Sequence, residues 1–208
     1  MLKRVAVKWV LMLGLCLAGG LARAEAGPTM VPTRAAAIPA AAAEAQTVLA
    51  LARDLIERVR YGALITVDSE GQPRSRVVDA FSPTAEFVVW VATRPNTRKV
   101  AQIRAHQQVT LYYWDPESRS YVSIMGGAEI VDDLPTKLAM RREADNSRLY
   151  PQFPADYVLI KVTPVRLEGV LPGYRGDKDN WAPVAVDFAP ANGESPPPLA
   201  LLQVSRVR

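Results

Sequence analysis

Six short runs of strand-forming residues, separated by turns, follow one amphipathic helix in this sequence, and this pattern limits the possible folds more than any other feature. Each run is rich in β-branched and aromatic residues and is bounded by turn-forming residues. The predicted strands are 63–67, 74–81, 86–92, 109–114, 121–131 and 157–163. Turn sequences at 68–71 and 115–118 predict hairpins. The pattern predicts a mainly β fold, a barrel or a sandwich, with flanking helices.

Three helical segments accompany these strands. The first, 44–61, repeats apolar side chains at helical spacing with charged residues between them, which indicates a helix packed on a core. Shorter helices are predicted at about 97–105 and 135–145. The segment 44–170 is long enough for one domain with its own core. We expect 171–208 to form an extension and tail, because the patterns weaken there.

The start of the chain, 1–24, has the parts of a secretory signal peptide. A basic stretch ends at Lys8, an apolar run follows, and the Ala-Arg-Ala at 22–24 offers small residues where a signal peptidase cuts. The apolar run is shorter than the about 20 residues of a spanning helix, so we expect cleavage rather than an anchor. Cys16 follows a bulky leucine, which argues against lipid attachment. We expect a periplasmic protein that begins with an Ala- and Pro-rich linker at 25–43.

Charge and composition exclude several functions. The 208 residues include 25 Lys and Arg against 21 Asp and Glu, but four of the basic residues and no acid lie in 1–24. The remaining chain therefore has no net charge and no electrostatic reason to bind nucleic acid. His106 is the only histidine and Cys16 the only cysteine, so one chain cannot build a zinc site from several such ligands.

Residues near the second predicted helix have the features of an anion site. Thr97 is a good N-cap, and the unpaired amides of the first turn behind it carry the positive end of the helix dipole. Arg98 and Lys99 add two cations, and Thr93 can present a hydroxyl from the end of the preceding strand. Together these groups suit a nucleotide phosphate. The alternative is that Arg98 and Lys99 are solvated surface residues.

Three motifs resemble the FMN-binding split β-barrel of the pyridoxamine 5'-phosphate oxidase family. The run 88–100, VVWVATRPNTRKV, is similar to that family's strand, threonine-bearing turn and Ser/Thr-Arg-Lys helix start. The run 71–78, GQPRSRVV, resembles a family strand whose arginine contacts the flavin nucleotide, and 109–129 resembles the next hairpin. The resemblance implies a split β-barrel that binds FMN at a homodimer interface.

The resemblance also implies roles for individual residues. Arg76, Thr93, Thr97, Arg98 and Lys99 would hold the phosphate and ribityl chain, the backbone of Val77 and Val78 would lie beside the ring, and Tyr121 or Trp181 would cover it. Strand alternation independently places Arg76 and Val78 on one face and Val77 on the other. An arginine on an aliphatic face needs a partner, and an internal salt bridge to Asp79 or Glu129 is the alternative to a ligand.

Departures from the family pattern bear on the reaction. Phe81 stands where the true oxidases place a lysine for the cofactor, and Tyr121 stands where they place a glutamine. The basic substrate signature near their C-terminus has no match either. The closer resemblance is to the general-stress-protein branch, whose members often carry a tryptophan in the position that Trp181 would take. Ordinary packing is the alternative role for Tyr121 and for Trp181.

We therefore expect an exported flavoprotein that binds FMN and carries out flavin-dependent redox chemistry on a small substrate. Flavin supplies the redox reactivity, so the chain needs no acid, base or nucleophile of its own. The alternative is a non-enzymatic split-barrel module that binds haem, deazaflavin or another ligand. Related barrels in haem metabolism use an axial histidine, but His106 lies where a histidine more often caps a helix C-terminus.

Overall fold

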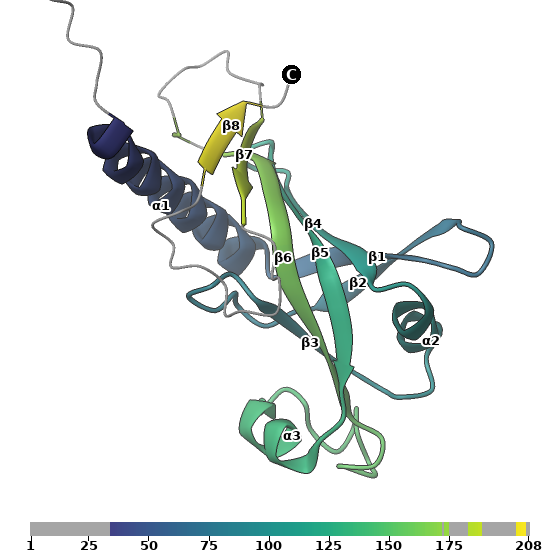
Figure 1. Ribbon diagram of the computed structural model, residues 1–208. Helices are drawn as coiled ribbons and strands as arrows, with labels where there is room; N and C mark the ends of the chain where they lie inside the picture. Colours follow the sequence, from purple (N-terminus) through teal and green to yellow (C-terminus); the bar gives the residue numbers. More distant parts are fainter. Residues whose placement is uncertain (1–33, 172, 175–182, 189–202, 207–208) are drawn as a thin grey trace, which may run out of the picture. The chain divides into compact units, whose positions relative to one another are not determined.

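The computed structural model describes residues 34–171, 173–174, 183–188 and 203–206 (Figure 1). This part of the chain forms α1 (Arg34–Val59), β1 (Tyr61–Val67), β2 (Pro73–Asp79), β3 (Val89–Thr93), α2 (Arg98–Ala105), β4 (Gln108–Asp115), β5 (Ser120–Val131), α3 (Leu134–Met140), β6 (Val158–Val170), β7 (Val184–Asp187) and β8 (Gln203–Arg206). The predicted signal peptide lies outside the described residues. Among the residues that are described, no helix is long and apolar enough to cross a membrane.

The long strand β6 organises the sheet. It pairs with β5 along one edge. On the other edge, β3 pairs with the first part of β6, from Val158 to Val162, and β7 pairs with the second part, from Arg166 to Gly169. The strand order is β2-β1-β4-β5-β6-β7-β8, with β3 off this path. One strand therefore carries both a barrel wall and a C-terminal extension of the sheet.

The sheet curls toward a barrel but does not close. In the described structure β2 meets β3 through a single backbone bridge, between Ala80 and Val91, rather than through a continuous ladder. The predicted split β-barrel is confirmed. Among the described residues, the outer backbone edge of β2 consequently has no partner strand along most of its length.

A register shift bends the β5–β6 ladder. It falls between Met125, which pairs with Arg166, and Gly126, which pairs with Pro164. A side chain at position 126 would place its Cβ 2.1 Å from the carbonyl oxygen of Thr163, so only glycine fits there. Pro164 lacks the backbone N–H that a regular ladder requires, and it is tolerated here because the ladder is interrupted at the register shift.

Helix α1 closes the core on the inner face of the sheet (Figure 1). Its buried side chains recur at helical spacing and meet buried side chains from the strands. The helix contributes Ala45, Val48, Leu49, Ala52, Leu55 and Ile56, and the strands contribute Leu64, Leu111, Ile124 and Leu167 among others. Removing this apolar surface from water is the main term that stabilises the fold.

Two arginines attach α1 to loops of the barrel. Arg53 donates hydrogen bonds to the carbonyl oxygens of Pro83 and Thr84, between β2 and β3. Arg58 pairs with the carboxylate of Asp115 at the β4–β5 turn, with 2.8 Å between Nη2 and Oδ2. The helix thus holds both loops in addition to covering the core.

The first helix is longer than predicted. It begins at Arg34 rather than at 44, and it ends at Val59. The added segment is rich in alanine, which has the highest helix propensity of all residues. The Ala- and Pro-rich composition predicted a linker, but the alanines extend the helix instead. The predicted linker 25–43 therefore overlaps α1 in residues 34–43, and its first part lies outside the described residues.

The six predicted strands and both hairpin turns are confirmed, with changed bounds. β6 runs on past the predicted end at 163, because Pro164 sits at the register shift and does not end the strand. β7 and β8 were not predicted. Each is only four residues long, and each depends on pairing to a neighbour rather than on a pattern of its own. α3 ends at Met140, before the predicted 145, because Arg142 turns back to bind Asp145.

Asp115 makes the free energy of unfolding depend on pH in the acidic range. The Ser118 hydroxyl and the Arg58 guanidinium bind its carboxylate and lower its pKa from 3.8 to about 2. The stabilising contribution is therefore complete above the unfolded-state pKa of 3.8 and is lost as the pH falls through 2. We expect Asp115→Asn to be less stable than wild type at pH 7 and the difference to shrink toward pH 2 in urea unfolding. Asp54→Asn, at an exposed position of α1, is the control, and an unchanged difference at both pH values would contradict this pairing.

Candidate anion-binding site

Three cationic side chains lie close together where β2 approaches the start of α2. Burial lowers the pKa of the Arg76 guanidinium, and the nearby charge of Arg98 lowers it further. Burial and the charge of Arg76 likewise lower the pKa of the Lys99 ammonium. Within the described residues none of the three forms an ion pair with a carboxylate. The cluster therefore carries positive charge that nothing in this part of the chain compensates.

Arg76 is held by uncharged groups. Its Nη1 donates to the carbonyl oxygen of Leu64 at 3.0 Å and to the Thr66 hydroxyl at 2.7 Å. Its Nη2 donates to Oε1 of Gln102 on α2 at 2.8 Å. These contacts fix the guanidinium against β1 and α2 at the same time.

The alternative of an internal salt bridge for Arg76 is wrong. Asp79 pairs instead with Arg60 and Arg142, and Glu129 pairs with Lys161. Both carboxylates are thus committed to other cations, and Arg76 keeps its charge available.

The predicted alternation along β2 is confirmed. Val78 is buried, and Arg76 lies opposite the buried Leu64 on the same inner face. Val77 points the other way and is 74% exposed. The half-buried arginine therefore sits at the border between the core and solvent, where an anion can reach it.

Thr97 occupies the predicted N-cap position of α2, but its hydroxyl does not cap the helix. Its backbone is extended, with φ −111° and ψ 150°, and its Oγ1 donates to the carbonyl oxygen of Arg94 at 3.2 Å. The first turn thus receives no side-chain cap. The N–H of Val100 donates to the carbonyl oxygen of Thr97, and the N–H groups of Arg98 and Lys99 stay available to a bound anion. Thr93 is buried at the end of β3, just before the loop that leads to α2.

The structure does not bring Tyr121 to the cationic cluster of its own chain. Tyr121 lies on the outer face of β5, opposite Trp114, and stacks on Tyr112 with ring centroids 5.6 Å apart. Arg76 lies on the inner face, in register across the sheet with Ile124. Trp181, the other predicted ring-covering residue, lies outside the described residues.

Phe81, at the position of the missing lysine, belongs to a small second hydrophobic cluster. It packs with Trp90 and Phe153 around the buried Tyr157. The guanidinium of Arg142 lies 4.1 Å from the centroid of the Phe81 ring. Phe81 therefore has a packing role here.

His106 follows α2 as its C-cap residue, as the pattern predicted, and it is exposed. Its backbone N–H donates to the carbonyl oxygen of Gln102 at 2.8 Å. The described residues contain no cluster of His, Cys, Asp or Glu that could hold a metal ion.

Two residues of this site were missed in the sequence, Thr66 and Gln102. A signal existed for Thr66, because alternation along β1 places it on the same buried face as Leu64. Gln102 lies one helical turn after Arg98 on α2, which places both side chains on one side of that helix.

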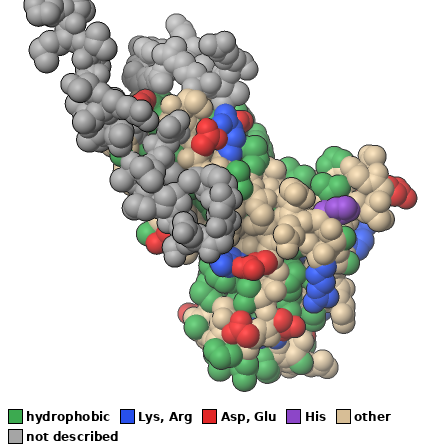
Figure 2. All heavy atoms as spheres, in the orientation of Figure 1, with side chains coloured by type: hydrophobic (Ala, Val, Ile, Leu, Met, Phe, Trp, Pro, Cys, Tyr) green, Lys and Arg blue, Asp and Glu red, His purple; other side chains and the backbone are tan. Residues whose placement is uncertain are grey.

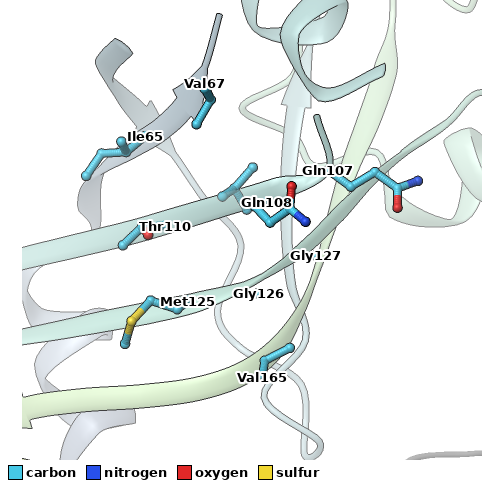
Figure 3. A pocket seen from close by; sticks show the side chains of 10 residues that line it. Ile65, Val67, Gln107, Gln108, Thr110, Met125, Gly126, Gly127 and Val165 are labelled. Carbon is cyan, nitrogen blue, oxygen red and sulfur yellow. The ribbon is translucent and has the colours of Figure 1, made fainter. Parts of the chain in front are cut away.

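The outer face of the sheet carries a separate apolar cavity of about 520 Å³. Figure 3 shows its lining, which comes from Ile65, Val67, Thr110, Met125 and Val165, with Gln107 and Gln108 at one side. Exposed hydrophobic side chains also gather at the α3 end of the molecule (Figure 2), where Leu134 and Leu138 are more than half exposed.

The fold and the cluster together define a split-barrel protein with a cationic site at the opening of the barrel. The family model described as pyridoxamine 5'-phosphate oxidase matches residues 49–171, which is more than half of the chain. The chain belongs to the pyridoxamine 5'-phosphate oxidase family. No curated protein matches it.

Solved structures share this fold. General Stress Protein 26 from Bacillus anthracis strain Sterne is 26% identical, with a TM-score of 0.51, over 59% of this chain and 93% of that chain. A protein related to general stress protein 26, from Clostridium acetobutylicum, has a TM-score of 0.55 at 19% identity, over 61% and 90% of the two chains. A pyridoxamine 5'-phosphate oxidase-related, FMN binding protein from Nostoc punctiforme has a TM-score of 0.53 at 15% identity, over 78% and 94%. The resemblance to this superfamily is confirmed.

Repulsion among the three neighbouring cations should lower the stability of the ligand-free protein by a measurable amount. We expect Lys99→Met to raise the free energy of unfolding by about 0.5 kcal/mol at low salt, because it removes a partly screened repulsion. Added sulfate should stabilise wild type more than this variant, as measured by thermal unfolding. Arg104→Met, in the last turn of α2, is the matched control. A loss of stability in Lys99→Met would show that the three charges do not repel.

Proposed function

We propose that this protein is an exported flavoprotein that binds FMN and transfers electrons between the flavin and a small substrate. The observation that carries the proposal is the uncompensated cluster of Arg76, Arg98 and Lys99 at an uncapped helix start, in a chain of the pyridoxamine 5'-phosphate oxidase family. Cations and free amides without a competing carboxylate are what a phosphate monoester needs.

The residues present fit a flavin nucleotide. Arg76, Arg98 and Lys99 would bind the phosphate, with the hydroxyls of Thr93 and Thr97 beside them. The open edge of β2 leaves backbone N–H and C=O groups near Val77 and Val78 that can pair with the polar edge of a ring. When bound, FMN supplies the redox chemistry, and the chain's own part is to hold and orient it.

We assign a second copy of the chain to the outer face of the sheet. This face carries the apolar cavity with the exposed Val165 in its lining, the exposed Val77, and the stacked pair Tyr112 and Tyr121. Tyr121 faces away from Arg76 of its own chain, and we assign it to the ring that is bound at the partner's site. The proposed dimer therefore gives this tyrosine the role that the family resemblance implies.

Export is part of the proposal and rests on the signal-peptide pattern of residues 1–24. Expression of the full chain should yield a periplasmic protein that starts near residue 25. Its visible absorption spectrum, before and after adding FMN and gel filtration, tests the function directly. A retained flavin band would support the proposal. A haem band would promote the binding-module alternative, and a colourless protein that ignores FMN would overturn the proposed function.

Removing two of the cations should abolish tight FMN binding. We expect Arg98→Ala/Lys99→Ala to lower the affinity for FMN at least about 100-fold, since each charge-assisted hydrogen bond is worth about 1.5–3 kcal/mol. Flavin fluorescence titration measures this loss. Riboflavin, which lacks the phosphate, should bind wild type and variant equally weakly. Arg104→Ala should keep FMN binding, and unchanged FMN affinity in the double variant would remove the site assignment.

Introducing a charge on the outer face of the sheet tests whether this face forms the proposed dimer. Val165→Lys places an ammonium beside the outer cavity, where Val165 is 54% exposed, so the fold should persist while the dimer dissociates. Sedimentation velocity should then report a monomer. Leu138→Lys, at a similarly exposed position of α3, should leave the dimer intact. A dimer that survives Val165→Lys would exclude this face.

A further inference from the structure

Arg76, Thr66 and Gln102 form a closed triangle of hydrogen bonds, in which both partners of Arg76 are uncharged. Thr66 is fully buried, accepts a hydrogen bond from Nη1 of Arg76, and donates its hydroxyl proton to Oε1 of Gln102 at 2.6 Å. The same Oε1 accepts from Nη2 of Arg76 at 2.8 Å. Each side chain of the triangle thus contacts the other two, and the guanidinium is locked between β1 and α2.

The orientation of the Gln102 amide follows from its partners. Arg76 can only donate, so it must face Oε1, and this leaves Nε2 as the remaining polar atom of that amide. Nε2 is a donor and forms no hydrogen bond within the described residues. The unused polar groups here are therefore all donors, from Gln102, Arg98 and Lys99.

The absence of an acidic partner for Arg76 in this triangle is unusual. A partly buried arginine is normally paired with a carboxylate, which offsets the cost of removing its charge from water. Glutamate at position 102 would provide this charge with the same side-chain length and the same two acceptor contacts. Glutamine instead holds the guanidinium and leaves the charge uncompensated.

We propose that Gln102 and Thr66 are positioning residues that hold Arg76 with neutral acceptors, so that its charge remains available to the phosphate group of an incoming ligand. The inference rests on the proposed function and deepens it. It explains why the site contains a half-buried arginine without an acidic partner among the described residues. It also adds two residues to a site of which the sequence had shown only the cations and threonines.

The test is Gln102→Glu, which changes charge and almost nothing else. At pH 8 we expect it to lower FMN affinity at least about tenfold, because a carboxylate next to Arg76 competes with the phosphate. Affinity should return toward the wild-type value as the pH is lowered and the new carboxyl is protonated. A purely structural role would give no such pH dependence. Gln46→Glu, the same change on the exposed face of α1, should leave binding unchanged.

A second variant covers the case in which Gln102→Glu does not fold. Thr66→Val keeps the side-chain shape but removes the hydroxyl that contacts both Arg76 and Gln102. We expect it to weaken FMN binding about three- to tenfold without any new pH dependence, since no charge is introduced. Unchanged affinity in both variants, with wild type binding FMN, would overturn the positioning role and leave the proposed function standing.

A measurement without flavin separates the two proposals. In the ligand-free protein, the pKa of the Lys99 ammonium can be followed by NMR after lysine labelling. Burial and the nearby charge of Arg76 both lower this pKa in wild type. Gln102→Glu should raise it, because the new carboxylate offsets the charge of Arg76. If wild type binds no FMN, a raised Lys99 pKa still supports the role of Gln102 as a neutral partner of Arg76. An unchanged Lys99 pKa overturns it.

Discussion

The pairing of β6 with three other strands is the constraint on which the rest of the structure depends. β5 occupies one edge of β6, and β3 and β7 share the other. The other edge of β3 faces β2, but within the described residues these two strands meet only at the bridge between Ala80 and Val91. The barrel is thus split between β2 and β3, and the split places the open edge of β2 close to the loop that leads from β3 into α2.

The positions of the cations follow from that split. β2 carries Arg76 along its open side, and the chain that leaves β3 begins α2 with Arg98 and Lys99. The core contributes indirectly, since α1 and the inner strand residues fill the barrel and leave Arg76 at its border. Positive charge is thereby concentrated beside the open edge of β2, so that the groups proposed to bind the phosphate and those proposed to bind the ring become neighbours.

The sequence predicted those features that depend on local pattern. The strands followed from alternation, and Arg98 and Lys99 were found because they stand beside a capping threonine in the chain. Thr66 and Gln102 were missed because their contact joins positions 36 residues apart in sequence. The hydroxyl of Thr97 donates to the backbone carbonyl of Arg94 instead of accepting from a helix amide. Both partners are close to Thr97 in sequence, so the loop geometry decides between them. Tyr121 lies on the outer face of the sheet, away from Arg76 of its own chain, and the ring-covering role proposed for it needs a second chain, which no pattern within one chain reveals.

Two half-buried arginines of this chain show how charge is allocated between stability and binding. Arg142 pairs with Asp145 at 3.0 Å and lies near Asp79, and Asp145 also accepts a hydrogen bond from Tyr157. Its charge is compensated, and it packs on Phe81 where the family's oxidases have a lysine for the cofactor. Arg76 has no such acid among the described residues and is held by neutral groups instead. Removing a charge from water without an opposite charge nearby is unfavourable. Of these two arginines only Arg76 is in that situation, and the phosphate of a bound ligand would compensate its charge.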